Sequence, residues 1–302
     1  MTIKANTCQQ ALGVGLMYNP ALKSFVRSQL GSYDYLEVTS DMFWTDQGEQ
    51  ATPRFTMIKS WTHLLDWAAA HVPLVAHNIG LSIGTAGKFD ISYLHHLRRW
   101  HERYGFAWHS DHLSYFKVAD QAGATHSSGM AIPLPWDYDA LEMIIERARL
   151  VQKTIGAPFL LENGVAYIDF PEQEMSEAEF LNALTRRSNC SLLLDLHNLY
   201  TNAVNRKGNP VDFIDSIDLS SVLEVHIAGG SEFVGMYTDS HAGACPEAVF
   251  DLLEYVMSQV PSLRGVTFEF HDSYFALLGE SGVRAQLDRA REIWNTHRAS
   301  VQ

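Results

Sequence analysis

Eight short apolar or β-branched runs are spaced along the chain and separated by longer stretches. The runs occupy residues 13–18, 33–39, 73–79, 106–113, 157–163, 191–197, 221–227 and 265–271. Most are near-continuous in apolar residues, which is typical of parallel strands covered on both faces. Eight strand–helix units in one chain predict an α/β fold, with a (β/α)8 TIM barrel as the first choice. A doubly wound open sheet is the alternative, but no GxGxxG motif follows the first run.

The stretches between these runs carry helical signals. Helical periodicity is clearest over residues 54–71, 138–155 and 246–260. Ser176 precedes Glu179 by three residues, which predicts a capping box at the start of a further helix. Residues 280–298 are expected to form the last helix. Two longer polar or glycine-rich segments, 40–53 and 116–132, are expected to be loops that form lids over a site.

Composition excludes several classes of protein. The chain has 302 residues and is 46% hydrophobic, so a single TIM-barrel catalytic domain over residues 1–302 is expected. The net charge of −13 argues against nucleic-acid binding, which needs Lys and Arg to neutralise phosphates. No run approaches the ~20 apolar residues of a membrane span. The first residues lack the features of a signal peptide, so a cytoplasmic protein with no membrane contact is expected. Three scattered cysteines with no CxxC pair disfavour a thiolate metal site.

The strand candidates end in side chains that bind metals. Six strong ligand candidates stand at the ends of runs, namely His77, His112, Glu162, Asp195, His226 and Glu269, and two more, Asp239 and His241, lie in the TDSH motif between the last two runs. In a barrel the C-terminal ends of the strands meet at one face, so these side chains are expected to converge there. Imidazole and carboxylate ligands suit zinc, iron, manganese or cobalt. Because one ion uses three or four protein ligands, eight candidates are enough for two or three ions.

Each candidate also has a structural interpretation. An isolated histidine at a strand end is more often a hydrogen-bonded core residue, and glutamates at a barrel rim can form ion pairs. Burying several carboxylates without cations is costly, however, and almost no Lys or Arg lies near these strand ends. The joint pattern therefore favours a metal site, with no catalytic residue predicted beyond the ligands themselves.

Several neighbouring residues are weaker candidates. Asp111, Asn163 and Asn198 stand beside the predicted ligands and are candidates for further ligation or for orienting the ligands. Tyr115 is one of several aromatic residues near the same rim, where they would form a partly apolar wall for a substrate. His271 follows Glu269 with one residue between, so it is expected to share that residue's face and contact substrate.

Taken in order, these motifs resemble a known family. The strings HNIGLSIG, SDHLSY, IPLPW, LLEN and TDSH, with the apolar runs around them, are similar to the DUF692 family. Its characterised members are multinuclear non-heme iron-dependent oxidases (MNIOs). The resemblance implies a xylose-isomerase-like TIM barrel that holds two or three iron ions in mixed Fe(II) and Fe(III) states. It also carries the family's metal ligands onto the eight candidates named above.

Two positions depart from the family pattern. The family commonly has Asn where this chain has His197, and an imidazole there would ligate a metal directly or reshape the pocket. The family often reads SEN after the second strand, whereas this chain reads TSDMFW. Asp41 therefore stands where an Asn or Glu is usual and is a further candidate for substrate contact.

The resemblance also implies a function. Characterised relatives use O2 as co-substrate to oxidise a residue, usually a cysteine, of a ribosomally synthesised precursor peptide. They generally need a small partner protein that recruits the peptide. The alternatives are a divalent-metal hydrolase or isomerase of the xylose-isomerase-like or endonuclease IV-like barrel class, and a barrel that binds a peptide or metal without turnover. Bound iron with oxygen uptake would favour the oxidase over the first of these.

Overall fold

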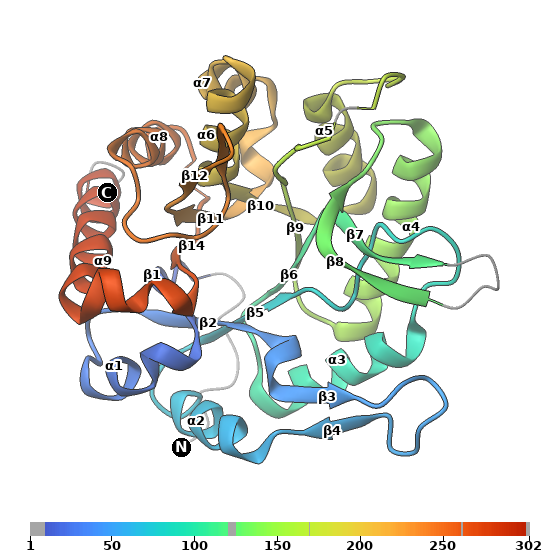
Figure 1. The fold of residues 1–302 in the computed structure, drawn as a ribbon, viewed down its shortest axis with the longest axis horizontal. Coiled ribbons are helices and arrows are strands. Elements are labelled where there is room, and N and C mark those ends of the chain that lie inside the picture. The colour runs from blue at the N-terminus through green and yellow to red at the C-terminus, as the bar shows by residue number, and fades with distance from the viewer. Residues whose placement is uncertain (1–9, 120–124, 169, 261, 300–302) are drawn as a thin grey trace.

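The protein folds as a closed barrel of eight parallel strands surrounded by helices (Figure 1). The computed structural model describes residues 10–119, 125–168, 170–260 and 262–299; Cys8 lies outside them. Neighbouring strands follow the order β1-β14-β11-β10-β9-β6-β5-β2. The strands are β1 (Gly13–Tyr18), β2 (Tyr35–Thr39), β5 (Leu74–Asn78), β6 (His109–His112), β9 (Phe159–Glu162), β10 (Ser191–Asp195), β11 (Val222–Ala228) and β14 (Gly265–Glu269). All eight predicted runs contain a barrel strand, which confirms the TIM barrel.

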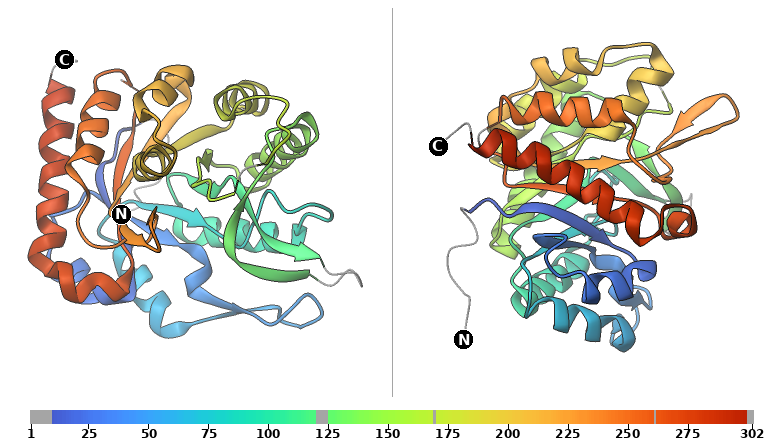
Figure 2. Two further views of the ribbon diagram at one scale, coloured as in Figure 1. Left: turned by 45° about the horizontal axis from the view of Figure 1, so that its top comes forward. Right: turned by 90° about the vertical axis from the view of Figure 1, so that its left-hand side faces the viewer.

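Helices form the outer layer of the barrel, as both views in Figure 2 show. The α-helices are α1 (Lys23–Ser28), α2 (Lys59–Ala68), α3 (Ile91–Tyr104), α4 (Tyr138–Ile155), α5 (Glu177–Ser188), α6 (Leu196–Arg206), α7 (Pro210–Ser216), α8 (Glu247–Met257) and α9 (Phe275–Ala299). Four 3-10 helices are η1 (Pro20–Leu22), η2 (Ser40–Phe43), η3 (Leu219–Ser221) and η4 (Asp272–Tyr274). The predicted capping box is present, because Ser176 and Glu179 exchange side-chain to backbone hydrogen bonds at the start of α5.

Three two-stranded hairpins leave the barrel after strand ends. They pair β3 (Trp44–Asp46) with β4 (Phe55–Met57), β7 (Ser114–Ala119) with β8 (Thr125–Pro133), and β12 (Ser231–Phe233) with β13 (Met236–Thr238). The expectation that residues 40–53 and 116–132 are loops was wrong for the parts that pair into strands. The sequence signal was weak because β3 and β4 have three residues each, and the described residues of β7 and β8 are mostly half-buried or exposed.

The barrel interior changes from apolar to polar toward the C-terminal ends of the strands. Tyr35, Val75, Trp108, Leu160 and Leu193 form an apolar cluster inside it. Alternate residues of a strand share a face, so Ser110 and His112 follow Trp108 on the interior side of β6. Acids and imidazoles follow above this cluster, and Glu224 is hydrogen-bonded to Tyr35 and Trp108 at the boundary. Among the described residues, no helix is both long and apolar enough to cross a membrane.

Candidate metal centre

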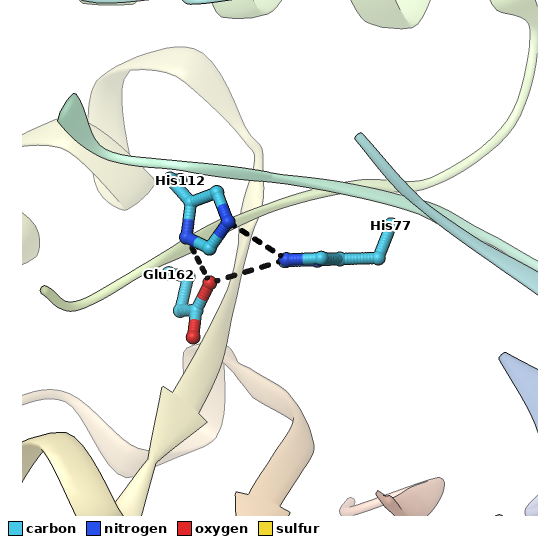
Figure 3. A group of neighbouring side chains, drawn as sticks. All are labelled: His77, His112 and Glu162. Atoms are coloured by element: carbon cyan, nitrogen blue, oxygen red, sulfur yellow. Dashed lines mark hydrogen bonds and ion pairs between the residues drawn. The ribbon is translucent and has the colours of Figure 1, made fainter. Parts of the chain in front are cut away.

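His77, His112 and Glu162 form the first part of the site and lie at the ends of β5, β6 and β9 (Figure 3). Glu162 Oε2 lies 2.7 Å from His112 Nδ1 and 3.5 Å from His77 Nε2. The two imidazoles approach each other with 3.1 Å between their Nε2 atoms. Ser110 Oγ lies 2.8 Å from His77 Nδ1, which fixes the orientation of that ring. Three ligand atoms of these residues lie within 4.8 Å of one another, a spacing that one metal ion can span.

Glu162 also belongs to a second group, with Asp195 and His226 from the ends of β10 and β11. Ligand atoms of these three residues again lie within 4.8 Å of one another. The buried Asp195 Oδ2 has no hydrogen-bond partner, whereas Glu162 Oε2 and His226 Nδ1 face other possible ligands, at 2.7 Å from His112 Nδ1 and 3.2 Å from Glu269 Oε2. Buried polar atoms are nearly always hydrogen-bonded, so an unpartnered carboxylate oxygen beside two atoms that face other possible ligands fits a cation.

The third part of the site contains Asp239, His241 and Glu269. His241 Nε2 lies 2.9 Å from Asp239 Oδ1, and its Nδ1 lies 3.1 Å from Glu269 Oε1. Glu269 Oε2 in turn lies 3.2 Å from His226 Nδ1, which joins this part to the second. His241 has a left-handed backbone with φ 49°, a conformation uncommon outside glycine. The structure thus brings all eight predicted ligands into one connected network.

The charges of this network are balanced by histidines alone. In the part of the chain that the structure describes, no lysine or arginine pairs with Glu162, Asp195, Asp239 or Glu269. Burial and the charges of Glu162 and Asp239 raise the pKa of Asp195 well above its usual range. Burial opposes ionisation of Glu269, but His241 and His226 beside it hold its pKa well below its usual range. Cations would relieve this crowding of acids.

Two buried glutamates beneath the site were not predicted from the sequence. Glu37 on β2 is fully buried, and its Oε2 lies 2.9 Å from His226 Nε2. Its other oxygen lies 3.9 Å from His77 Nδ1. A carboxylate at the far nitrogen of a ligating histidine fixes the ring and its tautomer. Glu224, two residues before His226 on β11, accepts hydrogen bonds from Trp108, Tyr35 and Thr267.

The predicted neighbours of the ligands have different positions. Asn163 exchanges two hydrogen bonds with the backbone of Asp195, which locks the ends of β9 and β10 together. Asn198 donates its backbone N–H to Asp195 Oδ1 and holds its side-chain nitrogen 3.5 Å from Glu162 Oε1. Asp111 is buried and accepts the N–H of His112, but its side chain belongs to none of the ligand groups.

The weaker substrate candidates lie away from this network. Asp41 accepts the backbone N–H groups of Ile79 and Gly80 and the hydroxyl of Tyr93, so it braces the chain that follows His77. His271 is exposed and caps η4, with its Nδ1 2.7 Å from Ser273 Oγ. It does not continue the face of Glu269, because β14 ends at that residue. Tyr115 is half-buried on β7 against the outer core.

Comparison with known proteins places the chain in a family. The family described as "RiPP precursor modification enzyme MbnB/TglH/ChrH" matches residues 11–294. The chain belongs to this family. Its members modify ribosomally made precursor peptides and are metal-dependent enzymes, in agreement with the clustered ligand groups of this barrel. This confirms the resemblance drawn from the motifs.

Relatives in sequence carry only a family designation. A UPF0276 protein of Caulobacter vibrioides is 28% identical over 289 residues, which cover 95% of this chain and 96% of that protein. A UPF0276 protein of Streptomyces avermitilis is 32% identical over 234 residues, covering 75% of this chain and 48% of that protein. One from Neisseria meningitidis serogroup B is 31% identical over 217 residues, covering 68% and 74%.

Solved structures with similar folds are distant in sequence. A D-psicose 3-epimerase of Clostridium cellulolyticum aligns with a TM-score of 0.58 at 12% identity, covering 93% of this chain and 99% of that one. A xylose isomerase-like TIM barrel protein of Mycobacterium smegmatis in complex with magnesium gives 0.54 at 13% identity, covering 96% and 100%. At such identities the likeness establishes the xylose-isomerase-like fold and nothing further.

His197 supports a ligand candidate from behind. It is fully buried at the start of α6, and its Nδ1 lies 2.9 Å from Asp239 Oδ1. Its Nε2 lies 3.4 Å from the Tyr237 hydroxyl. An asparagine amide can place its nitrogen where a histidine has Nδ1. We therefore expect His197→Asn to retain the metal, whereas His197→Ala lowers metal affinity about 10- to 100-fold. Metal titration of both variants measures this, and equal losses in the two would contradict it.

Metal binding is expected to depend on pH. Burial lowers the basicity of His112, but the Glu162 carboxylate beside it raises its pKa to about 9 in the metal-free protein. His112 then holds a proton at pH 7 that an incoming ion must displace. Apparent affinity should rise about tenfold per pH unit for each displaced proton, and level off above the pKa of His112. Calorimetric titration with Zn²⁺ in buffers of different ionisation enthalpy counts these protons. A metal affinity that does not change between pH 6 and 8 would contradict displacement of a proton from His112.

Proposed function

We propose that the protein is a multinuclear non-heme iron oxidase that uses O2 to modify a cysteine of a ribosomally synthesised precursor peptide. The proposal includes two or three iron ions in mixed Fe(II) and Fe(III) states and a small partner protein that recruits the peptide. The observation that carries it is the buried group of Glu162, Asp195 and His226, whose ligand atoms lie within 4.8 Å of one another and in which Asp195 Oδ2 has no hydrogen-bond partner. Family membership supports the peptide as substrate.

The donor set fits iron in more than one oxidation state, because imidazole and carboxylate oxygens suit both ferrous and ferric ions. Glu162 is common to two of the ligand groups, so it is the candidate bridging carboxylate. When bound, the ions would supply the redox chemistry of O2 that side chains alone lack. The chain contributes the ligand spacing, the orientation of His226 through Glu37, and a sheltered site.

The substrate reaches this site through a cavity of about 230 Å³ lined by His112, Glu162, Asn198, Asp239 and His241. A thiol held there would stand beside ligands from all three parts of the network. His112, His241 and Asp239, which are 25%, 23% and 22% exposed, are the ligand candidates most open to it. The buried members Asp195 and His226 would then hold the ions from below.

The test is reconstitution with iron followed by reaction in air. The protein is co-expressed with the short reading frames that neighbour its gene, and the peptide products are examined by mass spectrometry with and without O2. We expect two or three irons per chain and an oxygen-dependent mass change at a cysteine. Tightly held zinc or magnesium, with no oxygen uptake in the presence of these peptides, would favour the hydrolase or isomerase instead.

A further inference from the structure

The cavity above the ligands is one of two that adjoin. Besides the ligands, its wall is mostly apolar and contains Leu113, Met130, Pro133, Trp136 and Val165. At about 230 Å³ it is smaller than the roughly 300–1,000 Å³ of typical small-molecule pockets. It therefore suits a single side chain better than a whole free ligand.

The second cavity lies farther from the ligands and measures about 510 Å³. It shares Pro133, Trp136, Ala166 and Glu177 with the inner cavity, so the two adjoin. Ile168, Phe170 and Pro171 line only the outer one. Ile168 is 51% exposed, which marks this wall as an apolar surface open to solvent.

Glu177 stands at the junction of the two cavities, as the first residue of α5. Its half-buried carboxylate makes no hydrogen bond or ion pair with the described part of the chain. Burial raises its pKa to about 7, against the opposing charge of Arg206. A carboxylate that is partly desolvated and unpartnered inside a cavity is set up to accept a hydrogen bond from something that enters.

We propose that the two cavities form a channel for an extended peptide, in which the reacting side chain fills the inner cavity and an adjacent apolar side chain fills the outer one. Glu177 accepts a backbone N–H of the peptide at the junction. This inference rests on the proposed function and adds a requirement to it: the residue next to the modified cysteine must be apolar. Ile168 is then a specificity-determining residue, and Glu177 positions the peptide whatever its sequence.

An extended peptide fits these observations because its amide N–H groups recur along the chain, whatever its sequence. Neighbouring side chains of a strand point to opposite sides, and the junction at Glu177 separates two compartments of different size. A compact polar metabolite would leave the apolar wall at Ile168 and Phe170 uncovered. The channel therefore favours a peptide with one apolar neighbour over a small sugar.

The experiment uses the full chain loaded with Co²⁺ and two blocked tripeptides, acetyl-Leu-Cys-Leu-amide and acetyl-Asn-Cys-Asn-amide. Thiolate-to-cobalt absorption reports entry of the cysteine into the inner cavity and gives a dissociation constant without turnover. The wild type should bind the leucine peptide about tenfold more tightly, because a leucine side chain that enters the outer cavity is removed from water. Equal affinities for the two peptides, or no absorption band with either, would overturn the channel.

Three variants separate the contributions of Glu177 and of the apolar outer wall to peptide binding. Glu177→Gln should weaken both peptides by up to about tenfold, since the amide oxygen still accepts the peptide N–H but without the added strength of a charged acceptor. Ile168→Asn should weaken binding of the leucine peptide only. Ile168 is largely exposed, so the substitution should not destabilise the fold. Glu172→Gln, an exposed acid that lines neither cavity, is the matched control and should bind as the wild type does.

Failure of the channel and failure of the oxidase are distinguishable. Selective binding of the leucine peptide to the cobalt protein, with no oxygen-dependent change in the iron protein, would support the channel and contradict the oxidase. Oxidation of cysteine peptides regardless of neighbour, with unchanged binding to Glu177→Gln, would support the oxidase and overturn the channel.

Discussion

A Glu162→Gln variant is expected to lose most of its bound metal. Glu162 contributes to both ligand groups that meet at the barrel mouth, beside His77 and His112 on one side and Asp195 and His226 on the other. Glutamine keeps the shape but removes the charge and one acceptor, so both groups are weakened at once. We expect metal affinity to fall at least about 100-fold, beyond the 10- to 100-fold typical of residues that only support a ligand.

Metal content by plasma emission spectrometry, after reconstitution and desalting, measures this loss. Circular dichroism establishes that the barrel is still folded, and Glu172→Gln serves as the control for removing one acidic charge. Peptide modification should fall in parallel with the metal. A folded Glu162→Gln protein with the wild-type metal content would show that Glu162 is not a ligand shared by two ions. That result would contradict the multinuclear interpretation.

The barrel and its ligands were predictable because each depends on a local signal. Parallel strands covered on both faces read as short apolar runs, and all eight runs contain a strand. The ligands stand at the ends of those runs, where the direction of a parallel strand alone assigns them to one face. Asp239 and His241 lie outside the barrel strands and were predicted from the TDSH motif and its family resemblance. The structure joins them to the rest through Glu269.

The cavity wall and the two buried glutamates depend on contacts between distant segments, so the sequence gives weaker signals for them. The wall that the two cavities share joins Glu177 of α5 to Trp136 and Ala166, which follow β8 and β9, and no local sequence pattern predicts that contact. Glu224 had an available signal, since it precedes His226 by two residues and so shares its face of β11. Glu37 had only its charge within an apolar run, because no predicted ligand lies on β2 to reveal which face points inward.

Replacing Glu37 is expected to have the second large effect, on both stability and metal binding. Its carboxylate is fully buried and lies against His226 Nε2. Burial lowers the pKa of that imidazole, but the charges of Glu37 and Glu269 outweigh burial and raise the pKa well above its usual range. Glu37→Leu removes one partner of a buried charged pair, which costs about 3–5 kcal/mol. Glu37→Gln keeps an acceptor oxygen but not the charge. It should retain the fold and lower metal affinity about 10- to 100-fold.

Urea unfolding of the metal-free proteins measures the first effect, and metal titration the second. Glu224→Gln is the contrasting variant. Glu224 lies in a third possible ligand group with Glu37 and His226, but its oxygens accept hydrogen bonds from Tyr35, Trp108 and Thr267 and make none with the histidine. Its metal affinity should change little. If Glu37→Gln and Glu224→Gln bind metal alike, the position of Glu37 behind His226 has no bearing on the metal. If only Glu37→Gln binds metal more weakly, then Glu37 contributes to metal affinity although it is not itself at a strand end. It does so because it fixes the imidazole of His226, which faces Asp195 and Glu162.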